Sequence, residues 1–270
     1  MPRSKRRNDG ETQQLLNKDG VTFQIVSVQR NGRADNSRPR IQFNGNWLDE
    51  IGFVNGALVQ SLPESNGFVF NLCNENIGNY SDLFNSTREK GGTLIRVYLN
   101  KDNKQSGFVT TGTHIYKSGL AVGDSLVAKC EYGCIRVRKV IGNTRLIYVS
   151  RTKRPYTNEP APALFMSGEW LNDIGFMRDT LMTVASEPGC ITFTAYDKAI
   201  IYSEIVKFAR QHKMQLVQVS VKNSLPLITL TGNRIANAEF DLGEIFVAEY
   251  EHGIIRLLRF DPQRFGFPEA

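Results

Sequence analysis

Basic side chains are the residues of this 270-residue chain whose spacing most clearly indicates a chemistry, the binding of phosphate groups. Residues 136–154 contain seven Lys and Arg residues and no Asp or Glu, although the whole chain has a net charge of only +6. Such a local excess of positive charge is typical of a surface that binds a polyanion. On charge alone, a basic linker that serves only solubility is an equally good interpretation.

The candidate nucleic-acid-binding residues come from this stretch and from a second basic segment, residues 30–40. On strands and the loops between them, such side chains could follow a phosphate backbone without reading base sequence. The alternative is a strand edge that carries charge to prevent aggregation. The full candidate set is Arg30, Arg38, Arg40, Arg136, Arg138, Lys139, Arg145, Arg151, Lys153 and Arg154.

The sequence predicts no particular set of catalytic side chains. The three histidines do not recur at equivalent positions of the internal repeat described below, so no nucleophile–base pair follows from spacing. Cys130 and Cys134 are four residues apart, which is not a zinc-knuckle spacing, and their packing in a core is the simpler interpretation. We therefore expect no metal and no cofactor, and we leave the catalytic residues unassigned.

An internal repeat predicts how these residues are organised. The sequence PRIQFNGNWLDEIGF from residue 39 matches PALFMSGEWLNDIGF from residue 162, and GDSLVAKCEYG from residue 123 matches GEIFVAEYEHG from residue 243. We predict a basic tail (1–20), two homologous halves (21–142 and 143–261) and a C-terminal tail (262–270). Each half contains two glycine-anchored modules, near 39–72 and 105–140 in the first half and near 162–194 and 226–260 in the second.

Short alternating segments and regularly spaced glycines predict many short strands joined by tight turns. Residues 80–91 and 202–213 have the composition of helices and lie between the modules of each half. The expected fold class is therefore α+β, mostly short β-strands, with one inserted helix in each half. Modules of about 30 residues are too small to fold alone, and the sequence allows them to pair either within a half or across the halves.

The repeated block resembles a known family, the SymE-type toxins of bacterial type I toxin–antitoxin systems. The resemblance is carried by RLIYVS at 145–150, by PALFMSGEWLNDIGF from residue 162 and by GCITFT at 189–194, and GNWLDEIGF from residue 45 matches it again. It implies a core similar to the AbrB/MazE swapped-hairpin fold, present here as a tandem duplication. It also implies contact with nucleic acid, either RNA cleavage or DNA binding.

We predict a nucleic-acid-binding protein that contacts the phosphate backbone of RNA or DNA through basic strands and loops; endoribonuclease activity is implied by the resemblance alone. The alternative is a non-catalytic interaction or assembly module, with a protein partner or a second copy of the chain as its ligand. Strand-sized apolar runs, the lack of a signal-peptide pattern and only four cysteines lead us to expect a cytoplasmic protein without membrane contact.

Overall fold

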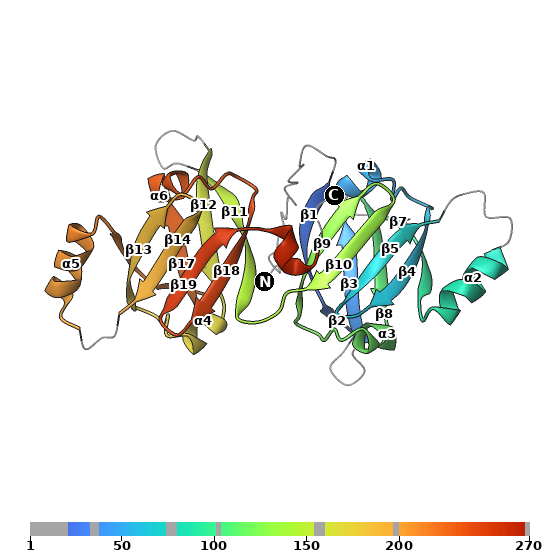
Figure 1. The fold of residues 1–270 in the computed structure, drawn as a ribbon, viewed down its shortest axis with the longest axis horizontal. Coiled ribbons are helices and arrows are strands. Elements are labelled where there is room, and N and C mark those ends of the chain that lie inside the picture. The colour runs from blue at the N-terminus through green and yellow to red at the C-terminus, as the bar shows by residue number, and fades with distance from the viewer. Residues whose placement is uncertain are drawn as a thin grey trace, which may run out of the picture. The chain divides into compact units, whose positions relative to one another are not determined.

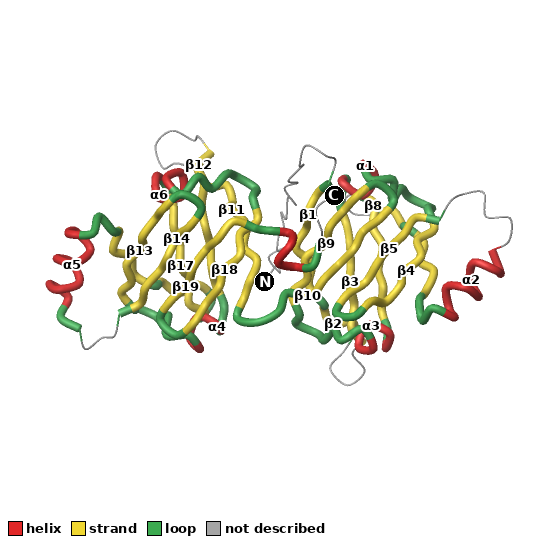
Figure 2. The backbone as a smooth tube through the Cα atoms, viewed as in Figure 1, coloured by secondary structure: helices red, strands yellow, loops and turns green. Residues whose placement is uncertain are grey.

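The computed structural model describes residues 21–32, 38–73, 80–100, 104–153, 160–196 and 200–267. The chain divides into two compact units, Met1–Lys139 and Val140–Ala270, which are drawn in Figure 1. Strands make up most of the regular structure in each unit, as the yellow segments of Figure 2 show. Within the described residues, no helix is long and apolar enough to cross a membrane.

The described residues of the first unit form ten strands and three helices. Its strands are β1 (Thr22–Ser27), β2 (Gln29–Asn31), β3 (Arg38–Asn44), β4 (Leu58–Glu64), β5 (Gly67–Leu72), β6 (Thr93–Arg96), β7 (Tyr98–Leu99), β8 (Ser106–Thr111), β9 (Ser125–Glu131) and β10 (Cys134–Lys139). Its helices are α1 (Trp47–Glu50), α2 (Tyr80–Glu89) and α3 (Thr113–Lys117).

In the part of the second unit that the structure describes, there are nine strands, three α-helices and a 3-10 helix. Its strands are β11 (Thr144–Lys153), β12 (Pro160–Ser167), β13 (Leu181–Glu187), β14 (Cys190–Ala195), β15 (Gln215–Gln218), β16 (Ser220–Lys222), β17 (Leu225–Thr231), β18 (Ile245–Glu251) and β19 (Ile254–Arg259). Its helices are α4 (Trp170–Asp173), α5 (Tyr202–Gln211), α6 (Asn233–Asn237) and the 3-10 helix η2 (Pro262–Phe265).

The strand order shows that each unit closes into a near-barrel. In the first unit, one sheet runs β1-β9-β10-β5-β4-β6 and the other runs β2-β3-β8-β7. The consecutive strands β1 and β2 pair with different sheets, and so do β6 and β7, so the sheets are joined at both edges. In the second unit, the order is β15-β13-β14-β19-β18-β11-β12-β17-β16, and β11 alone spans the change of partner.

Four buried valines, Val28, Val97, Val149 and Val219, mark the points where a strand changes partner. Each exchanges two backbone hydrogen bonds with a turn. The Val28 N–H donates to the Asp124 carbonyl at 2.9 Å, and the Gly123 N–H donates to the Val28 carbonyl at 2.8 Å. The turn residue that donates to the valine takes φ between +65° and +97° in all four places. This conformation suits glycine, which explains the glycine spacing seen in the sequence. These residues are Gly56, Gly123, Asp179 and Gly243.

The turn between β4 and β5 is made by Asn66, the residue before the repeated Gly67. Asn66 takes the left-handed conformation there, with φ +55°, and Gly67 begins β5. A Cβ on Gly67 would lie 2.2 Å from the Val137 carbonyl oxygen. A side chain is therefore excluded at residue 67 by the close approach of β10, not by the turn.

Aromatic side chains fill the centre of the first unit. The fully buried Phe108 ring lies 4.9 Å from Phe43, 5.5 Å from Phe53 and 5.3 Å from Phe70, measured between ring centroids. The alternation of buried and exposed residues along β3 places Ile41 and the Phe43 side chain inward. The second unit has a core of its own, in which smaller aliphatic side chains such as Ile228 take part.

The predicted α+β fold of swapped-hairpin modules is wrong, because the structure is mostly β with large near-barrel sheets. The stretches near 39–72 and 105–140 pair with each other, since β3 pairs with β8 and β5 pairs with β10. All pairings between described strands lie within one unit, which decides between the two pairings that the sequence allowed. The inserted helices are present as α2, which packs on β4 and β6, and α5, which packs on β15.

Candidate nucleic-acid interface

The basic stretch that is continuous in sequence is divided between the two units. Arg136, Arg138 and Lys139 lie on β10 in the first unit, whereas Arg145 lies on β11 in the second unit. The backbone of β11 extends to Arg151 and Lys153, of whose side chains nothing is described, and Arg154 lies outside the described residues. Adjacent positions in the sequence therefore do not establish one continuous basic groove.

Carboxylates partly neutralise the positive charge of the basic side chains on β10. Both Arg136 and Arg138 form ion pairs with Glu64 on the neighbouring part of the sheet, at 3.8 and 2.8 Å, and Lys139 pairs with Asp124 at 2.7 Å. Because these pairs are partly exposed, each is worth only about 0–1 kcal/mol of stability. Their larger effect is on the electrostatic potential, since they cancel much of the positive charge that a phosphate would meet.

The hairpin of β2 and β3 brings together the other predicted basic residues. Arg30 and Arg38 are exposed, and Arg40 is half-buried and donates a hydrogen bond to the Gln42 side-chain oxygen. The register pairs Arg30 with Pro39 and Arg38 with Asn31 across the hairpin. Arg30, Arg38 and Arg40 form no ion pair with another described residue.

Arg145 has a different environment, because its guanidinium stacks on an aromatic ring. The Arg145 Cζ atom lies 4.8 Å from the Trp170 ring centroid, and the Trp170 ring lies 5.0 Å from that of Tyr250. Trp170 is 9% exposed, and its indole N–H donates to the Ser167 carbonyl oxygen at 3.3 Å. The tryptophan is thus core material, as the sequence indicated, and Arg145 caps it through a cation–π contact.

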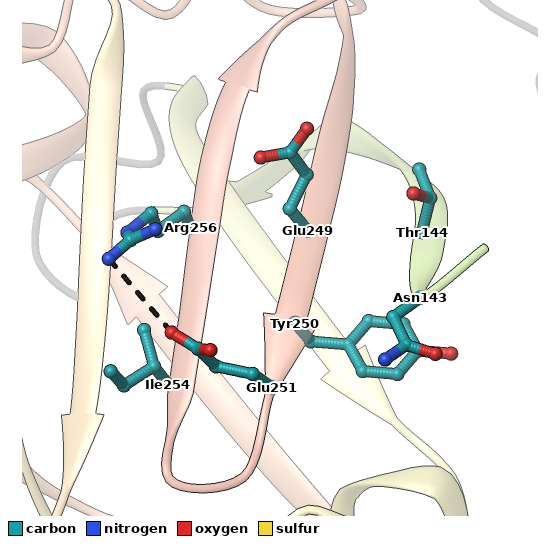
Figure 3. Close-up of a pocket in the computed structure, with 7 residues that line it drawn as sticks. All are labelled: Asn143, Thr144, Glu249, Tyr250, Glu251, Ile254 and Arg256. Carbon is teal, nitrogen blue, oxygen red and sulfur yellow. Dashed lines mark ion pairs between the residues drawn. The ribbon is translucent and has the colours of Figure 1, made fainter.

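Next to this stack lies a pocket of about 270 Å³, shown in Figure 3. Asn143 and Thr144 line it from the start of β11, and Tyr250 connects it to the Trp170 ring. The rest of its wall comes from the hairpin of β18 and β19. The side chains that complete the lining are Glu249, Glu251, Ile254 and Arg256.

The charged groups of this pocket are arranged in pairs. Arg256 approaches Glu251 at 4.0 Å, the contact dashed in Figure 3, and Arg264 pairs with Glu249. The Glu251 side chain is 63% exposed, so its carboxylate is open to solvent and to a ligand. A carboxylate next to a guanidinium can accept a proton while the guanidinium holds an anionic group.

Burial raises the pKa of the Cys130 thiol, and it also raises the pKa values of Cys134 and Cys73, so these thiols stay protonated. In the described ranges, no group of three or more His, Cys, Asp and Glu side chains could hold a metal ion. The cysteines are therefore packing residues in this structure.

His114 is expected to make the stability of the first unit depend on pH. Burial lowers its pKa below the ordinary value of 6.5; its Nε2 lies 2.9 Å from the Thr110 hydroxyl, and its ring meets Phe68 edge-on. As the pH falls through 6.5, the unfolded chain binds a proton that the folded chain resists, so stability is lost. Between about pH 7.5 and 5.5, we expect the urea midpoint of unfolding to fall less in His114→Gln than in the wild type. An equal fall in both proteins would contradict this prediction.

Comparison with known proteins finds a similar family for one segment of the chain. Residues 143–195 match the family model described as toxin SymE of type I toxin–antitoxin systems. They form a SymE-type segment. This segment runs from Asn143, at the pocket, through β11, β12, α4 and β13 to the end of β14 at Ala195. It also contains the Arg145–Trp170 stack, so the family likeness covers one wall of the pocket.

Proteins named Endoribonuclease SymE from Escherichia coli are similar over a somewhat longer stretch. Those of strain 55989, strain O157:H7 EC4115 and strain O6:H1 CFT073 are each 35% identical to this chain over 69 residues. The aligned part is 26% of this chain and 61% of each relative. The chain thus spans less than two thirds of the length of these relatives, and the SymE-type segment is a minor part of the chain.

The acidic residues that line the pocket are not among the candidates that the sequence indicates. Glu249 and Glu251 flank Tyr250 in the sequence EYE, and strand alternation puts both carboxylates on the face opposite to the tyrosine. That pattern was available in the sequence, but nothing local showed that Asn143 and Thr144 would lie beside it. The pairing of Thr144 with Glu249 between β11 and β18 brings them together across about 100 residues of chain.

Proposed function

We propose that this protein binds RNA and cleaves its backbone in the manner of a SymE-type toxin. The observation that carries the proposal is the pocket of Figure 3, in which the SymE-type segment meets a carboxylate and a guanidinium that approach each other at 4.0 Å. The printed name of the relatives, endoribonuclease, supports RNA as the substrate. An RNA substrate also agrees with a cytoplasmic location.

Binding is assigned to the basic residues that the sequence indicated. The arginines of the β2–β3 hairpin, Arg30, Arg38 and Arg40, form no ion pair with another described residue and would contact phosphates most readily. The compensated residues of β10 would contribute less, because Glu64 and Asp124 compete with phosphate for them. Further along the chain, we assign the same role to Arg145, Arg151, Lys153 and Arg154.

Cleavage is assigned to the pocket, with Glu251 as general base and Arg256 as the phosphate-binding group. Glu251 takes the proton of a ribose 2′-hydroxyl, whose oxygen attacks the adjacent phosphorus. The bond from phosphorus to the 5′-oxygen breaks, and that oxygen takes a proton from water. The products are a 2′,3′-cyclic phosphate and a 5′-hydroxyl. Arg256 neutralises the charge that builds up on the phosphate oxygens.

Labelled RNA tests this function directly. We expect salt-sensitive binding and cleavage to a 2′,3′-cyclic phosphate, and we expect an RNA with 2′-O-methyl groups to bind but remain intact. Absence of RNA binding at low salt would exclude the proposal, because phosphate contacts strengthen as salt falls. If binding fails and the protein instead forms a nuclease-resistant complex with itself or another protein, the assembly function is correct.

Removing Glu64 is expected to strengthen RNA binding. Glu64→Gln releases Arg136 and Arg138 from their ion pairs. The slope of log affinity against log salt concentration should steepen by about 0.7 for each released arginine that reaches a phosphate of a single strand. Fluorescence anisotropy over a range of salt concentrations measures both quantities. Glu187→Gln, at the corresponding end of β13, is the control and should change neither.

We propose further that the two units are duplicated copies, divided near residues 142–143 and each descended from two smaller modules. Both units have the same sequence of strand pairings, as in β3 with β8 and β12 with β17. Each unit also has two places where a turn residue with positive φ donates a backbone hydrogen bond to a buried valine. On this view, the first unit is a diverged relative of the unit that contains the SymE-type segment.

A further inference from the structure

We infer that the outer face of β3, β8 and β7 in the first unit binds single-stranded RNA, with a base stacked on Tyr98. This inference rests on the proposed function and assigns the binding step to a particular surface. The surface is defined by Arg38, Arg40, Gln42, Asn44 and Tyr98. We call it the polar ladder.

The polar ladder is held together by hydrogen bonds between side chains. Arg40 donates to the Gln42 side-chain oxygen, the Gln42 amide nitrogen donates to the Tyr98 hydroxyl at 3.2 Å, and that hydroxyl donates to Asn44 Oδ1 at 3.3 Å. Arg40, Gln42 and Asn44 share one face because side chains alternate along β3. The network fixes the tyrosine ring in place before any ligand arrives, which lowers the entropy cost of binding.

A glycine makes the tyrosine lie close to the sheet. In the register of the sheet, Gly107 lies between Asn44 on β3 and Tyr98 on β7. A Cβ at residue 107 would lie 2.3 Å from Asn44 Oδ1 and 3.2 Å from Tyr98 Cζ. The ring therefore leans over the position where a side chain is missing, and the tyrosine remains 37% exposed. This is the arrangement that a nucleobase needs for stacking on a sheet surface.

The charges and amides around the ring fit RNA rather than an apolar partner. The exposed Arg38 and the half-buried Arg40 lie at one end and supply positive charge for phosphates. Gln42 and Asn44 offer amide groups that can exchange their present hydrogen bonds for bonds to a base edge. At the other end, Asp49 accepts a hydrogen bond from Ser106, so this carboxylate is already engaged. Because stacking needs an unpaired base, the ligand is a single strand.

The second unit lacks these side chains at the corresponding places. Ala163 takes the place of Arg40: Arg40 pairs with Thr111 in the first unit, and Ala163 pairs with Thr231 in the second. Phe165 takes the place of Gln42: Gln42 pairs with Val109, and Phe165 pairs with Thr229. At the places of Asn44 and Tyr98 the second unit has Ser167 and Ser220, so it has neither the amide nor the aromatic ring there, and Phe165 is 44% exposed. The two units therefore differ on this face, which indicates that they have different roles. The first unit binds the RNA, and the second unit contains the cleavage pocket.

Binding of an uncleavable probe tests the polar ladder. The probe is a fluorescein-labelled 2′-O-methyl RNA of about eight nucleotides, within the range that single-strand sites cover. We expect Tyr98→Ala to weaken its binding by about 5- to 150-fold, the effect of losing one stacked base. Tyr98→Phe keeps the ring and should retain most of the affinity. Tyr132→Ala, which removes a tyrosine that is 81% exposed elsewhere in the same unit, should leave the affinity unchanged.

The outcomes separate this inference from the proposed function. If Tyr98→Ala binds as the wild type does while Arg38→Ala binds more weakly, the stacking surface is wrong and RNA binding stands. A preference for a duplex over the single strand would also overturn the inference. If the wild-type protein binds no RNA at low salt, both the inference and the proposed function fail. Unfolding midpoints of each variant show whether a loss of binding comes from loss of structure.

Discussion

Glu251→Gln is expected to slow RNA cleavage by about 10²- to 10⁴-fold while RNA binding is retained, because the change removes a general base and keeps the shape of the side chain. Arg256→Ala should also slow cleavage, since the guanidinium that lies 4.0 Å from Glu251 is lost from the same pocket. Single-turnover rates at saturating protein separate the chemical step from binding. The cyclic phosphate product identifies the bond that was broken.

The first unit provides the matched control for this experiment. Glu131 is the equivalent of Glu251, because it ends β9 and pairs with Cys134 just as Glu251 ends β18 and pairs with Ile254. Glu131 also forms an ion pair with Lys129 at 2.7 Å. Glu131→Gln should leave the cleavage rate unchanged. Equal rates for the wild type and Glu251→Gln, with cleavage of the expected bond, would show that the catalytic base lies elsewhere. Loss of cleavage in both variants would point to general destabilisation.

Phe108→Ala is expected to lower the free energy of unfolding of the first unit by about 3–5 kcal/mol, the range for removing a buried aromatic side chain. The ring is fully buried and contacts Phe43, Phe53 and Phe70, so its removal leaves a cavity bounded by three other rings. Urea unfolding followed by tryptophan fluorescence reports on this unit through the buried Trp47, which lies 6.3 Å from Phe43.

A surface aromatic residue serves as the comparison for Phe108. Tyr132→Ala removes a ring that is 81% exposed, so its effect on the urea midpoint should be small. Since the chain has two units, two transitions are expected, and only that of the first unit should move in Phe108→Ala. A shift of less than about 1 kcal/mol would mean that the neighbouring rings collapse into the space that Phe108 leaves.

Local features of the fold were predictable from the sequence. The turns at Gly123 and Gly243 and the helices α2 and α5 appear where composition and spacing placed them. Each depends on neighbouring residues only, on a positive φ or on a 3.6-residue apolar pattern. The sequence alone does not show why residue 67 is a glycine. Asn66 makes the turn, and the close approach of β10, about 70 residues away, excludes a side chain at Gly67.

The sequence did not predict which strands pair, and for that reason it did not predict the fold class. Short strands of similar composition can pair in several ways, and hydrogen bonds between backbones carry little information about the partner. The resemblance to SymE-type toxins led to swapped-hairpin modules, whereas the structure has near-barrel sheets. In them, β3 pairs with β8, and β6 and β7 pair with different sheets. These contacts decide which side chains share a face.

In the candidate sites, too, some features depend on neighbouring residues in the sequence and others on contacts between distant residues. Basic residues, the SymE-type segment and the repeated glycines could all be recognised in the amino-acid sequence, because each is a property of nearby positions. Only the tertiary structure decided that Glu64 compensates Arg136 and Arg138, that Arg145 stacks on Trp170, and that Glu251 lines a pocket with Asn143. Electrostatic and packing interactions depend on distance in space, and strand register sets that distance across tens of residues.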